Sequence, residues 1–192
     1  MKRTYQPKRK FRLIDVMKTM YKTLLTLLLL CLLCAAGKGY GQEVDIYVSK
    51  EGSDTSGNGS ESKPFVSIQK AIDSSKDGET VLVLPGTYKE NINYKGKNIT
   101  VASKFLTTED KSYIESTIID GDKKGSVVTF SSRESADSIL LGLTIQNGLK
   151  GSWSNNNYGG GGVYCSWSSP TIDNCLILNN EALQGGGLYF EY

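Results

Sequence analysis

The sequence contains no histidine, only four prolines and, from residue 42 onward, a single arginine, Arg133. Low proline content beside 21 glycines in 192 residues predicts many turns and no proline-rich linker. The main apolar segment, residues 24–36, is shorter than the ~20 residues that a helix needs to cross a bilayer. We therefore expect no retained membrane span.

Positive charge is also scarce in most of the chain. The formal net charge of +2 comes from the first 41 residues, because residues 42–192 contain 13 basic and 19 acidic residues, a net charge of −6. A domain with an acidic balance does not attract nucleic acid or anionic lipid, and we expect neither as a partner.

Residues 1–41 have the organisation of an export signal. A basic stretch precedes the apolar segment, and small residues follow it. We expect cleavage between Gly41 and Gln42, and a protein that is secreted, periplasmic or at the cell surface of a bacterium. Met17 is an alternative start, since the residues after it form a shorter signal of the same kind.

Two of the four cysteines lie in the signal, which leaves Cys165 and Cys175 in the exported chain. In an oxidising compartment these two can form a disulfide. Closing so short a loop would stabilise the fold by roughly 2 to 3 kcal/mol. Two unpaired thiols packed in the core are the alternative.

Short strand-like runs recur from residue 80 onward, with turn residues between them. Residues 161–164 (Gly-Gly-Val-Tyr) return as residues 186–189 (Gly-Gly-Leu-Tyr) at an offset of 25, and Ile119 matches Ile145 at an offset of 26. Repeats of this length with several strands and no helix predict a β-solenoid. Strands are expected within residues 42–48, 81–84, 99–102, 117–119, 127–130, 139–145, 162–165, 175–178 and 187–190.

A third alignment pairs residues 143–147 with residues 176–180 at an offset of 33, if residues 150–158 are an inserted loop. It predicts that Asn147 and Asn180 stack on successive coils and share amide hydrogen bonds, a structural role. The competing fold is an antiparallel sandwich, which needs hairpin turns of the Asn-Gly kind. Between the strand-like runs from residue 80 onward, Asn147-Gly148 is the one Asn-Gly pair.

One helix is expected, over residues 67–76. Ser67 can cap it, Ile68, Ala71 and Ile72 form a single apolar stripe, and Asp77-Gly78 ends it. We expect this helix to lie across the end of the stacked sheets and protect a strand edge. The organisation is therefore a strand, loop and capping helix in residues 42–79, and coils in residues 80–192.

The loop of residues 49–63 contains Asp54, Ser56 and Asn58 at the spacing of the first half of a calcium loop. Phe65 stands where an EF-hand places its bidentate glutamate, so an ordinary Asx-rich turn is the alternative. Calcium is the one cofactor that the residues suggest.

Several motifs together resemble a known superfamily. They are Pro-Phe at 64–65, Ile-Gln-Lys-Ala-Ile at 68–72, Val-Leu-Pro-Gly-Thr-Tyr at 83–88 and Ile-Ile-Asp-Gly at 118–121. These resemble the pectin-lyase-like superfamily of bacterial right-handed parallel β-helix proteins. Residues 180–188 are also similar to the repeat of polymorphic outer-membrane proteins and related adhesins. The resemblance implies an all-β, right-handed parallel β-helix of four or five coils with an N-terminal capping helix, but specifies no chemistry.

Lyases of that superfamily need a basic residue beside the uronate carboxylate, often with calcium held by aspartates, and hydrolases need two carboxylates on one face. The candidates here are Arg133, Asp120, Asp122 and Asp173. Asp120 and Asp122 share a face only if the chain is extended there, and a turn is the alternative. For Arg133 the alternative is a solvated salt pair, since Glu134 and Asp137 are nearby in the same polar turn.

Trp153, Tyr158 and Trp167 lie in or beside loops, where aromatic rings can stack on sugars. We expect a non-catalytic exported module that engages polysaccharide or another surface. One alternative is the N-terminal part of a polysaccharide lyase whose catalytic coils lie beyond residue 192. Another is the structural rod of an adhesin. Because the sequence stops inside a strand-like run, we expect a fragment of a longer protein.

Overall fold

The computed structural model describes residues 20–22, 43–151 and 159–192. The chain divides into two units, Met1–Gly39 and Tyr40–Tyr192. Of the first unit only residues 20–22 are described, and they are helical. The rest of the predicted signal and its cleavage position between Gly41 and Gln42 lie outside the described residues. Within the described ranges, no helix is long and apolar enough to cross a membrane.

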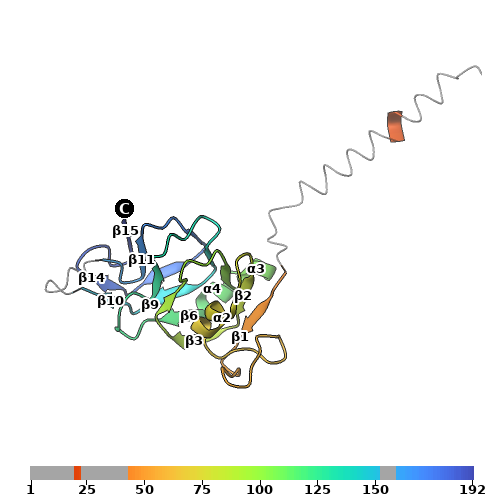
Figure 1. Ribbon diagram of the computed structural model, residues 1–192, viewed down its shortest axis with the longest axis horizontal. Coiled ribbons are helices and arrows are strands. Elements are labelled where there is room, and N and C mark those ends of the chain that lie inside the picture. Colours follow the sequence, from red (N-terminus) through yellow and green to blue (C-terminus); the bar gives the residue numbers. More distant parts are fainter. Residues whose placement is uncertain (1–19, 23–42, 152–158) are drawn as a thin grey trace, which may run out of the picture. The chain divides into compact units, whose positions relative to one another are not determined.

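Three parallel sheets form the second unit (Figure 1). The first contains β1 (Ile46–Val48), β2 (Thr80–Val83), β5 (Thr100–Ser103), β8 (Ile139–Leu141) and β12 (Thr171–Asp173). The second contains β3 (Gly86–Lys89), β6 (Thr117–Asp120), β9 (Thr144–Gln146) and β13 (Leu176–Leu178). The third contains β4 (Ile92–Asn93), β7 (Val128–Phe130), β11 (Val163–Ser166) and β15 (Leu188–Glu191).

From β2 onward the chain visits the three sheets in turn, so that one strand from each sheet makes one coil. Strands in each sheet pair with the equivalent strand of the next coil, in parallel and in register; for example Ile119 pairs with Ile145, and Val163 with Leu188. The predicted offsets of 26 and 25 residues are therefore confirmed. The predicted parallel β-solenoid is confirmed as well, and an antiparallel sandwich is excluded.

Side chains that point between the sheets form one continuous core. Alternate residues of the strands face inward, and they are fully buried in the coils that have a neighbour on both sides, as Val101, Ile119 and Phe130 are. Each such apolar side chain stabilises the fold by about 1.5 to 3 kcal/mol. The stacked coils thus supply each other's hydrophobic contacts.

The first sheet is apolar on its outer face as well. Leu82, Ala102 and Leu141 lie in one row there, beneath Leu106 of the short helix α3 (Phe105–Thr108). A second short helix, α4 (Ser112–Ser116), follows and accepts a hydrogen bond from Thr144 Oγ1 at the Ile114 carbonyl, 2.7 Å away. Burial on both faces explains why residues 80–84 show no polar alternation.

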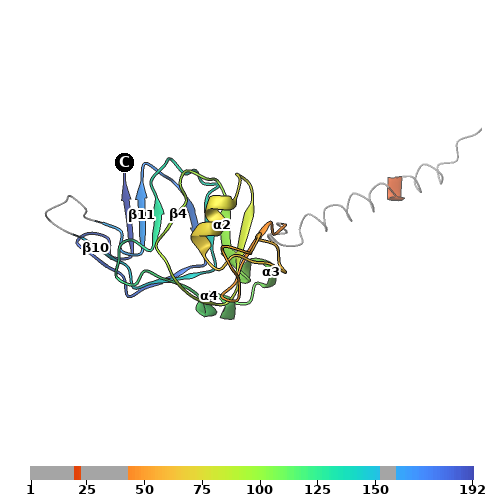
Figure 2. The same ribbon diagram turned by 60° about the horizontal axis from the view of Figure 1, so that its bottom comes forward.

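The predicted capping helix is α2 (Ile68–Ser74), which begins after Ser67 and buries Ile68, Ala71 and Ile72. It lies beside β4 at the end of the third sheet (Figure 2). The Gln69 side chain there imitates a neighbouring strand: its Oε1 accepts from Asn93 N at 2.8 Å and its Nε2 donates to Asn93 O at 3.1 Å. The helix therefore protects a strand edge, as expected.

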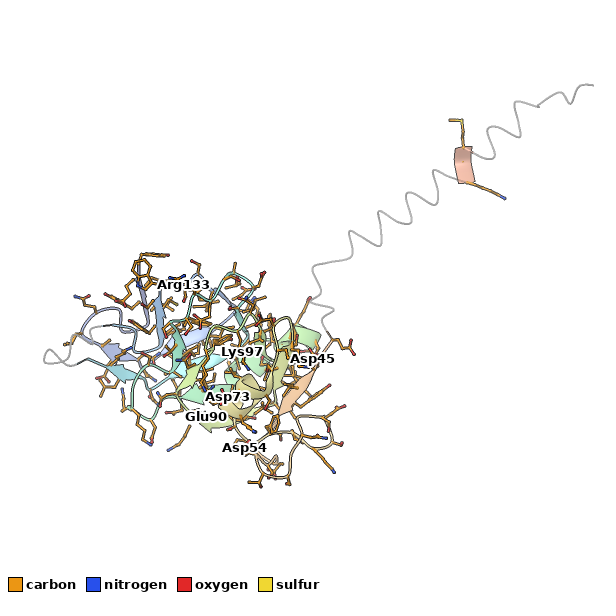
Figure 3. The ribbon with its side chains drawn as sticks, in the orientation of Figure 1. Asp45, Asp54, Asp73, Glu90, Lys97 and Arg133 are labelled. Atoms are coloured by element: carbon orange, nitrogen blue, oxygen red, sulfur yellow. The ribbon has the colours of Figure 1, made fainter. Side chains whose placement is uncertain are left out.

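The end of α2 is held by one ammonium group. Lys97 Nζ donates to the carbonyls of Ile72, Asp73 and Ser75 at 2.6, 2.8 and 2.6 Å. The Ile72 carbonyl also accepts from Ser75 N at 3.2 Å, and a cation at this end of the helix interacts favourably with the helix dipole. Figure 3 labels Lys97 and Asp73, which lie next to each other.

We expect Lys97→Met to lower the free energy of unfolding by about 2 kcal/mol, because three carbonyls lose a charged donor. Urea unfolding followed by circular dichroism measures this difference. Lys76→Met is the matched control, since the Lys76 side chain is exposed. Equal losses in the two variants would contradict the assigned role of Lys97.

Two sequence alignments need correction. The run of residues 139–145 is not one strand: Gly142, with a φ of +67°, forms the corner between β8 and β9. The predicted offset of 33 is wrong by one residue, because Leu176 pairs with Thr144. The sequence alignment matches Leu143 with Leu176, whereas in the structure Ile145 pairs with Ile177.

The predicted stack of Asn147 on Asn180 is wrong for the same reason. The corrected register places Asn147 beside Asn179, and both have left-handed backbones with φ of 56° and 55°. The Asn180 side chain instead binds the backbone of the previous coil: its Oδ1 accepts from Gly148 N at 2.7 Å, and its Nδ2 donates to Ile145 O at 2.9 Å. Both asparagines have structural roles, but not as an amide ladder.

The loops after β9 and β13 also pair with each other. Within them, β10 (Leu149–Lys150) and β14 (Glu181–Ala182) form a small two-stranded parallel sheet. The predicted inserted loop begins in β10 and continues through residues 152–158, which are not described.

Candidate functional site

The Asp120 carboxylate is fully engaged by the protein. It ends β6 and accepts from Asp122 N at 2.9 Å, Gln146 Nε2 at 3.1 Å and Asn147 Nδ2 at 2.7 Å. Burial opposes its ionisation, but these hydrogen bonds outweigh burial and lower the pKa of Asp120 below its ordinary value. The group therefore stays ionised and links two coils, which is unsuited to a general acid.

Asp122 does not share a strand face with Asp120. Its φ of 49° places it in a turn after β6, where it lies 2.8 Å from Lys124 Nζ and 3.6 Å from Lys89 Nζ. Hydrogen bonding and charge attraction from Lys124 lower the pKa of Asp122. The predicted pair of carboxylates is thus one buried group, Asp120, and one exposed group, Asp122, with separate side-chain partners, and the turn alternative is correct.

Asp173 is remote from that pair in the fold. It ends β12 in the first sheet, opposite Leu141, whereas Asp120 belongs to the second sheet. Its carbonyl accepts from the Cys175 thiol at 3.3 Å. The structure therefore does not assemble the predicted carboxylates into one site.

Cys165 and Cys175 are free thiols, so the structure has the unbridged alternative rather than the disulfide. Cys165 is buried in β11, and Cys175 is half-buried just before β13. Burial raises the pKa of Cys165 to about 12 and that of Cys175 to about 11. Neither thiol is a nucleophile near neutral pH.

The calcium-like loop uses its oxygens to fix the start of α2. The Asp54 carboxylate accepts from Val66 N, Ser67 N and Ser67 Oγ at 3.0, 3.2 and 2.7 Å. Asn58 Oδ1 accepts from Ser60 N and Oγ, and Ser56 N donates to the hydroxyl of Ser53. Throughout the described ranges, no three acidic or cysteine side chains are grouped to hold a metal ion.

A second carboxylate completes the attachment of α2. Glu90 accepts from Ile68 N and Gln69 N, both at 2.9 Å. Figure 3 shows Asp54 and Glu90 on the same side of the domain, with Arg133 far from both. Asp54 and Glu90 thus both hold the start of the capping helix.

Three exposed residues, Lys95, Arg133 and Trp167, follow the strands of the third sheet on three successive coils; we call them the corner row. All three have left-handed backbones, with φ of 55°, 65° and 50°. This conformation is uncommon for residues other than glycine, and a bulky residue in it is an outlier. The corner row therefore combines two cations and one indole on an unusual backbone.

Glu134 holds the corner row in place from inside. Its buried carboxylate accepts from Gly96 N at 2.8 Å, Ser132 N at 2.8 Å and Ser168 Oγ at 2.7 Å. Gly96 and Ser168 directly follow Lys95 and Trp167, so one carboxylate joins the corners of three coils. Burial opposes its ionisation, yet the hydrogen bonds prevail and the pKa of Glu134 is lowered.

The corner row is open to solvent. Trp167 is 69% exposed. Lys95 Nζ lies 2.7 Å from Asp73 on α2, but its side chain is still 53% exposed. Among the ion pairs of the described residues none includes Arg133, so the solvated salt pair considered for it, with Glu134 or Asp137, is not formed. Glu134 is turned inward to backbone and hydroxyl donors.

The outer face of the third sheet adjoins the corner row and has a tyrosine ladder. Tyr164 and Tyr189 are paired across β11 and β15, with rings parallel within 5° and centroids 6.1 Å apart. Lys150 Nζ lies 3.5 Å from the Tyr164 ring centroid, and the Tyr164 hydroxyl donates to Glu191. Because Lys150 covers the Tyr164 ring, we assign the ladder to coil packing.

Of the three aromatics predicted to contact sugars, only Trp167 is described; Trp153 and Tyr158 lie outside the described residues. Sequence reasoning treated Arg133 and Trp167 separately and did not consider Lys95. The signal that could have joined them is their position one to three residues past equivalent strands. Recognising it requires the strand ends, which the sequence placed only approximately.

A search of curated proteins finds no match for this chain. A family model matches residues 50–188, from the loop before α2 to the start of β15, which is more than half of the chain. The matched region contains the whole corner row and Glu134. The chain therefore belongs to the DUF1565 family, whose description is "protein of unknown function".

Proposed function

We propose that this protein is an exported, non-catalytic module that binds a polysaccharide through the corner row. The observation that carries the proposal is Trp167. A left-handed backbone costs roughly 1 to 2 kcal/mol at a residue other than glycine, and the exposed indole recovers little of this by burial. Strain of this kind, held by a rigid framework, is typical of residues kept for binding.

The framework suits that role. Trp167 N donates to Glu191 O at 3.0 Å, and the next residue, Ser168, bonds to Glu134. Binding residues commonly lie on loops positioned by a rigid scaffold, and these two attachments fix the loop on both sides of the indole. An exposed aromatic ring on a fixed backbone can stack on the apolar face of a sugar at a lower entropy cost than one on a loop that must first be ordered.

The non-catalytic part of the proposal rests on the carboxylates of the Asp120 turn and on the two thiols. Asp120 and Asp122 have lowered pKa values, so both carboxylates are ionised near neutral pH. Both thiols have raised pKa values, so both are protonated there. A general acid or base needs a pKa near the working pH, and none of the four groups has one. Export rests on the signal-like residues 1–41. We also infer kinship with the right-handed β-helix proteins of the pectin-lyase-like superfamily, supported by the parallel coils and the capping helix.

The test is binding of Trp167→Ala to a glycan array, followed by titration of the glycans that bind the unchanged protein. We expect affinity to fall at least tenfold, since stacking on one aromatic ring is worth about 1 to 3 kcal/mol by analogy with base stacking. Trp167→Tyr should retain part of the affinity. Tyr113→Ala, on α4, is the control and should bind normally.

Three results would overturn the proposal. Undiminished binding by Trp167→Ala would remove the site. Formation of unsaturated sugar, seen by ultraviolet absorbance, would support the lyase alternative. Adhesion to protein surfaces without binding to any glycan would support the structural rod.

A further inference from the structure

We infer, independently of the proposed function, that Asn58 is a site of spontaneous covalent modification, at which the folded protein exchanges a side-chain amide for a carboxylate. The sequence contains two Asn-Gly pairs, Asn58-Gly59 and Asn147-Gly148. Glycine has no Cβ atom, so its backbone can approach a neighbouring group more closely than that of other residues. An asparagine before glycine is therefore where a side-chain amide and a backbone nitrogen react most readily. The two pairs have different surroundings in the fold.

The reaction needs only water as a co-reactant. The backbone nitrogen of Gly59 attacks the side-chain carbon Cγ of Asn58 and gives up its proton to hydroxide. A new C–N bond closes a succinimide ring, the bond from Cγ to Nδ2 breaks, and ammonia leaves with a proton from water. Water then opens the ring at either of its carbonyls. The product is aspartate or, where the main chain now runs through Cγ, isoaspartate.

The Asn58 side chain is already folded towards that attack. Its Oδ1 accepts from Ser60 N at 3.1 Å and from Ser60 Oγ at 2.8 Å. The first of these bonds closes an Asx turn, a hydrogen-bonded ring that contains both Cγ of Asn58 and the nitrogen of Gly59. The two donors also lie on the oxygen that becomes negatively charged during the attack, and donors placed at such an oxygen stabilise the transition state. Asn58 is exposed, so hydroxide and water can reach it.

One contact opposes the reaction and sets its rate. Gly59 N donates to Lys63 O at 3.0 Å, so this bond must break before the nitrogen can attack. Asn58 N donates to the same carbonyl, also at 3.0 Å. Both bonds lie in a surface loop, where local opening requires little free energy. The Asx turn involves only residues 58–60, so opening of the loop frees the nucleophile and keeps both donors on Oδ1.

Asn147 lacks these features. Its Nδ2, the group that would leave, donates to the ionised carboxylate of Asp120 at 2.7 Å. Gly148 N, the group that would attack, is buried and donates to Asn180 Oδ1 at 2.7 Å. Among the described residues no donor reaches Asn147 Oδ1. Asn180 belongs to the next coil, so freeing Gly148 N would separate stacked coils rather than open a surface loop. We therefore expect Asn147 to persist.

Conversion of Asn58 alters the cover of the first sheet. Gly59 O accepts from Tyr47 N of β1 at 2.8 Å, and Gly59 is buried against Phe65. An isoaspartate at position 58 lengthens the main chain by one carbon atom and displaces Gly59 from this edge. Loss of one backbone hydrogen bond there should lower the melting temperature by about 2 to 4 °C. The modification is therefore a slow, irreversible loosening of the β1 edge.

The experiment follows both asparagines in the full protein during incubation in warm, mildly alkaline buffer. Peptide mapping by mass spectrometry detects the replacement of NH2 by OH at each site, and an isoaspartyl methyltransferase labels the isoaspartate. We expect the rate at Asn58 to exceed the rate at Asn147 by about tenfold or more, since one hydrogen bond in the barrier changes a rate by about that factor. In urea, where loops and coils are lost, the two rates should become similar.

Variants assign the reaction to the loop. Ser60→Ala removes the hydroxyl donor and keeps the backbone donor, so it should slow the reaction at Asn58 several-fold and leave the rate at Asn147 unchanged. Ser56→Ala is the matched control, because Ser56 is exposed in the same loop and the donors to Asn58 Oδ1 come from Ser60 alone. Asn58→Gln should abolish the reaction at this position, since its longer side chain must close a larger ring, and should melt unchanged after the same incubation.

Three results would overturn the assignment of Asn58. They are an intact Asn58 after a period in which both sites react in urea, a rate at Asn147 equal to that at Asn58 in the folded protein, and a Ser60→Ala variant that reacts as fast as the unchanged protein. An unchanged melting temperature in fully modified protein would overturn the loosening of the β1 edge. Glycan binding is measured separately, so failure of the proposed function leaves each of these results standing.

Discussion

Replacing Glu134 with alanine is expected to lower the free energy of unfolding by about 3 to 5 kcal/mol, because a buried, hydrogen-bonded charge leaves its donors without a partner. The donors are Gly96 N, Ser132 N and Ser168 Oγ, which belong to three coils. Urea unfolding at neutral pH measures the loss. It should exceed the loss caused by any substitution of an exposed carboxylate.

The effect should also depend on pH. The pKa of Glu134 is lower in the folded than in the unfolded state, so the folded protein favours the ionised form. Its contribution to stability is therefore fully present above the unfolded pKa and is lost as pH falls through the folded pKa. The difference between the unchanged protein and Glu134→Ala should be largest near neutral pH and smaller in acid.

Asp137→Ala is the matched control, since Asp137 lies in the same loop and is exposed. A surface substitution of this kind should change stability by no more than about 0.5 kcal/mol. If Glu134→Ala and Asp137→Ala were equally stable at neutral pH, Glu134 would not be the residue that joins the three corners.

Replacing Gly148 with alanine is expected to cost about 3 kcal/mol or more, at the upper end for overpacking a dense interior. A Cβ atom at Gly148 would come closer than 3.0 Å to the backbone oxygen and carbon of Gly161 and to a methyl group of Val127. Backbone cannot move aside as a side chain does. The two glycines bring together the two ends of the loop between β9 and β11.

Gly187→Ala serves as the control for that substitution. A Cβ there would meet only a methyl group of Ile177, at an ordinary 3.6 Å, and the φ of Gly187 is not left-handed. Thermal unfolding should therefore show a large loss for Gly148→Ala and little change for Gly187→Ala. Similar melting temperatures for the two variants would contradict the close approach of Gly148 to Gly161.

The fold was predictable because its signals are local and repeated. The Gly-Gly-Val-Tyr and Gly-Gly-Leu-Tyr segments correctly set the register of β11 against β15, and the polar cap and apolar stripe around Ile68 correctly located α2. The one-residue error at Asn180 arose where leucines suggested one register and backbone pairing chose another. The helices α3 and α4 were missed because each is a single turn covering an outer face.

The candidate site was harder to predict because its cause is not local. Lys95, Arg133 and Trp167 are unlike one another and are separated by more than thirty residues at each step. What unites them is the buried carboxylate of Glu134, whose partners come from other coils. From sequence Glu134 resembled a solvated loop residue, and only the stacking of coils turns it inward.

The most direct test of the corner row is backbone amide NMR of the protein during titration with a glycan that it binds. We predict that the largest shift changes fall on residues 95–96, 132–134 and 166–168, with little change at Asp120, Gln146 or the loop of residues 49–63. Changes concentrated on the outer face of the second sheet, around Asp120 and Gln146, would contradict the account and place the ligand on the side that this structure assigns to coil stabilisation.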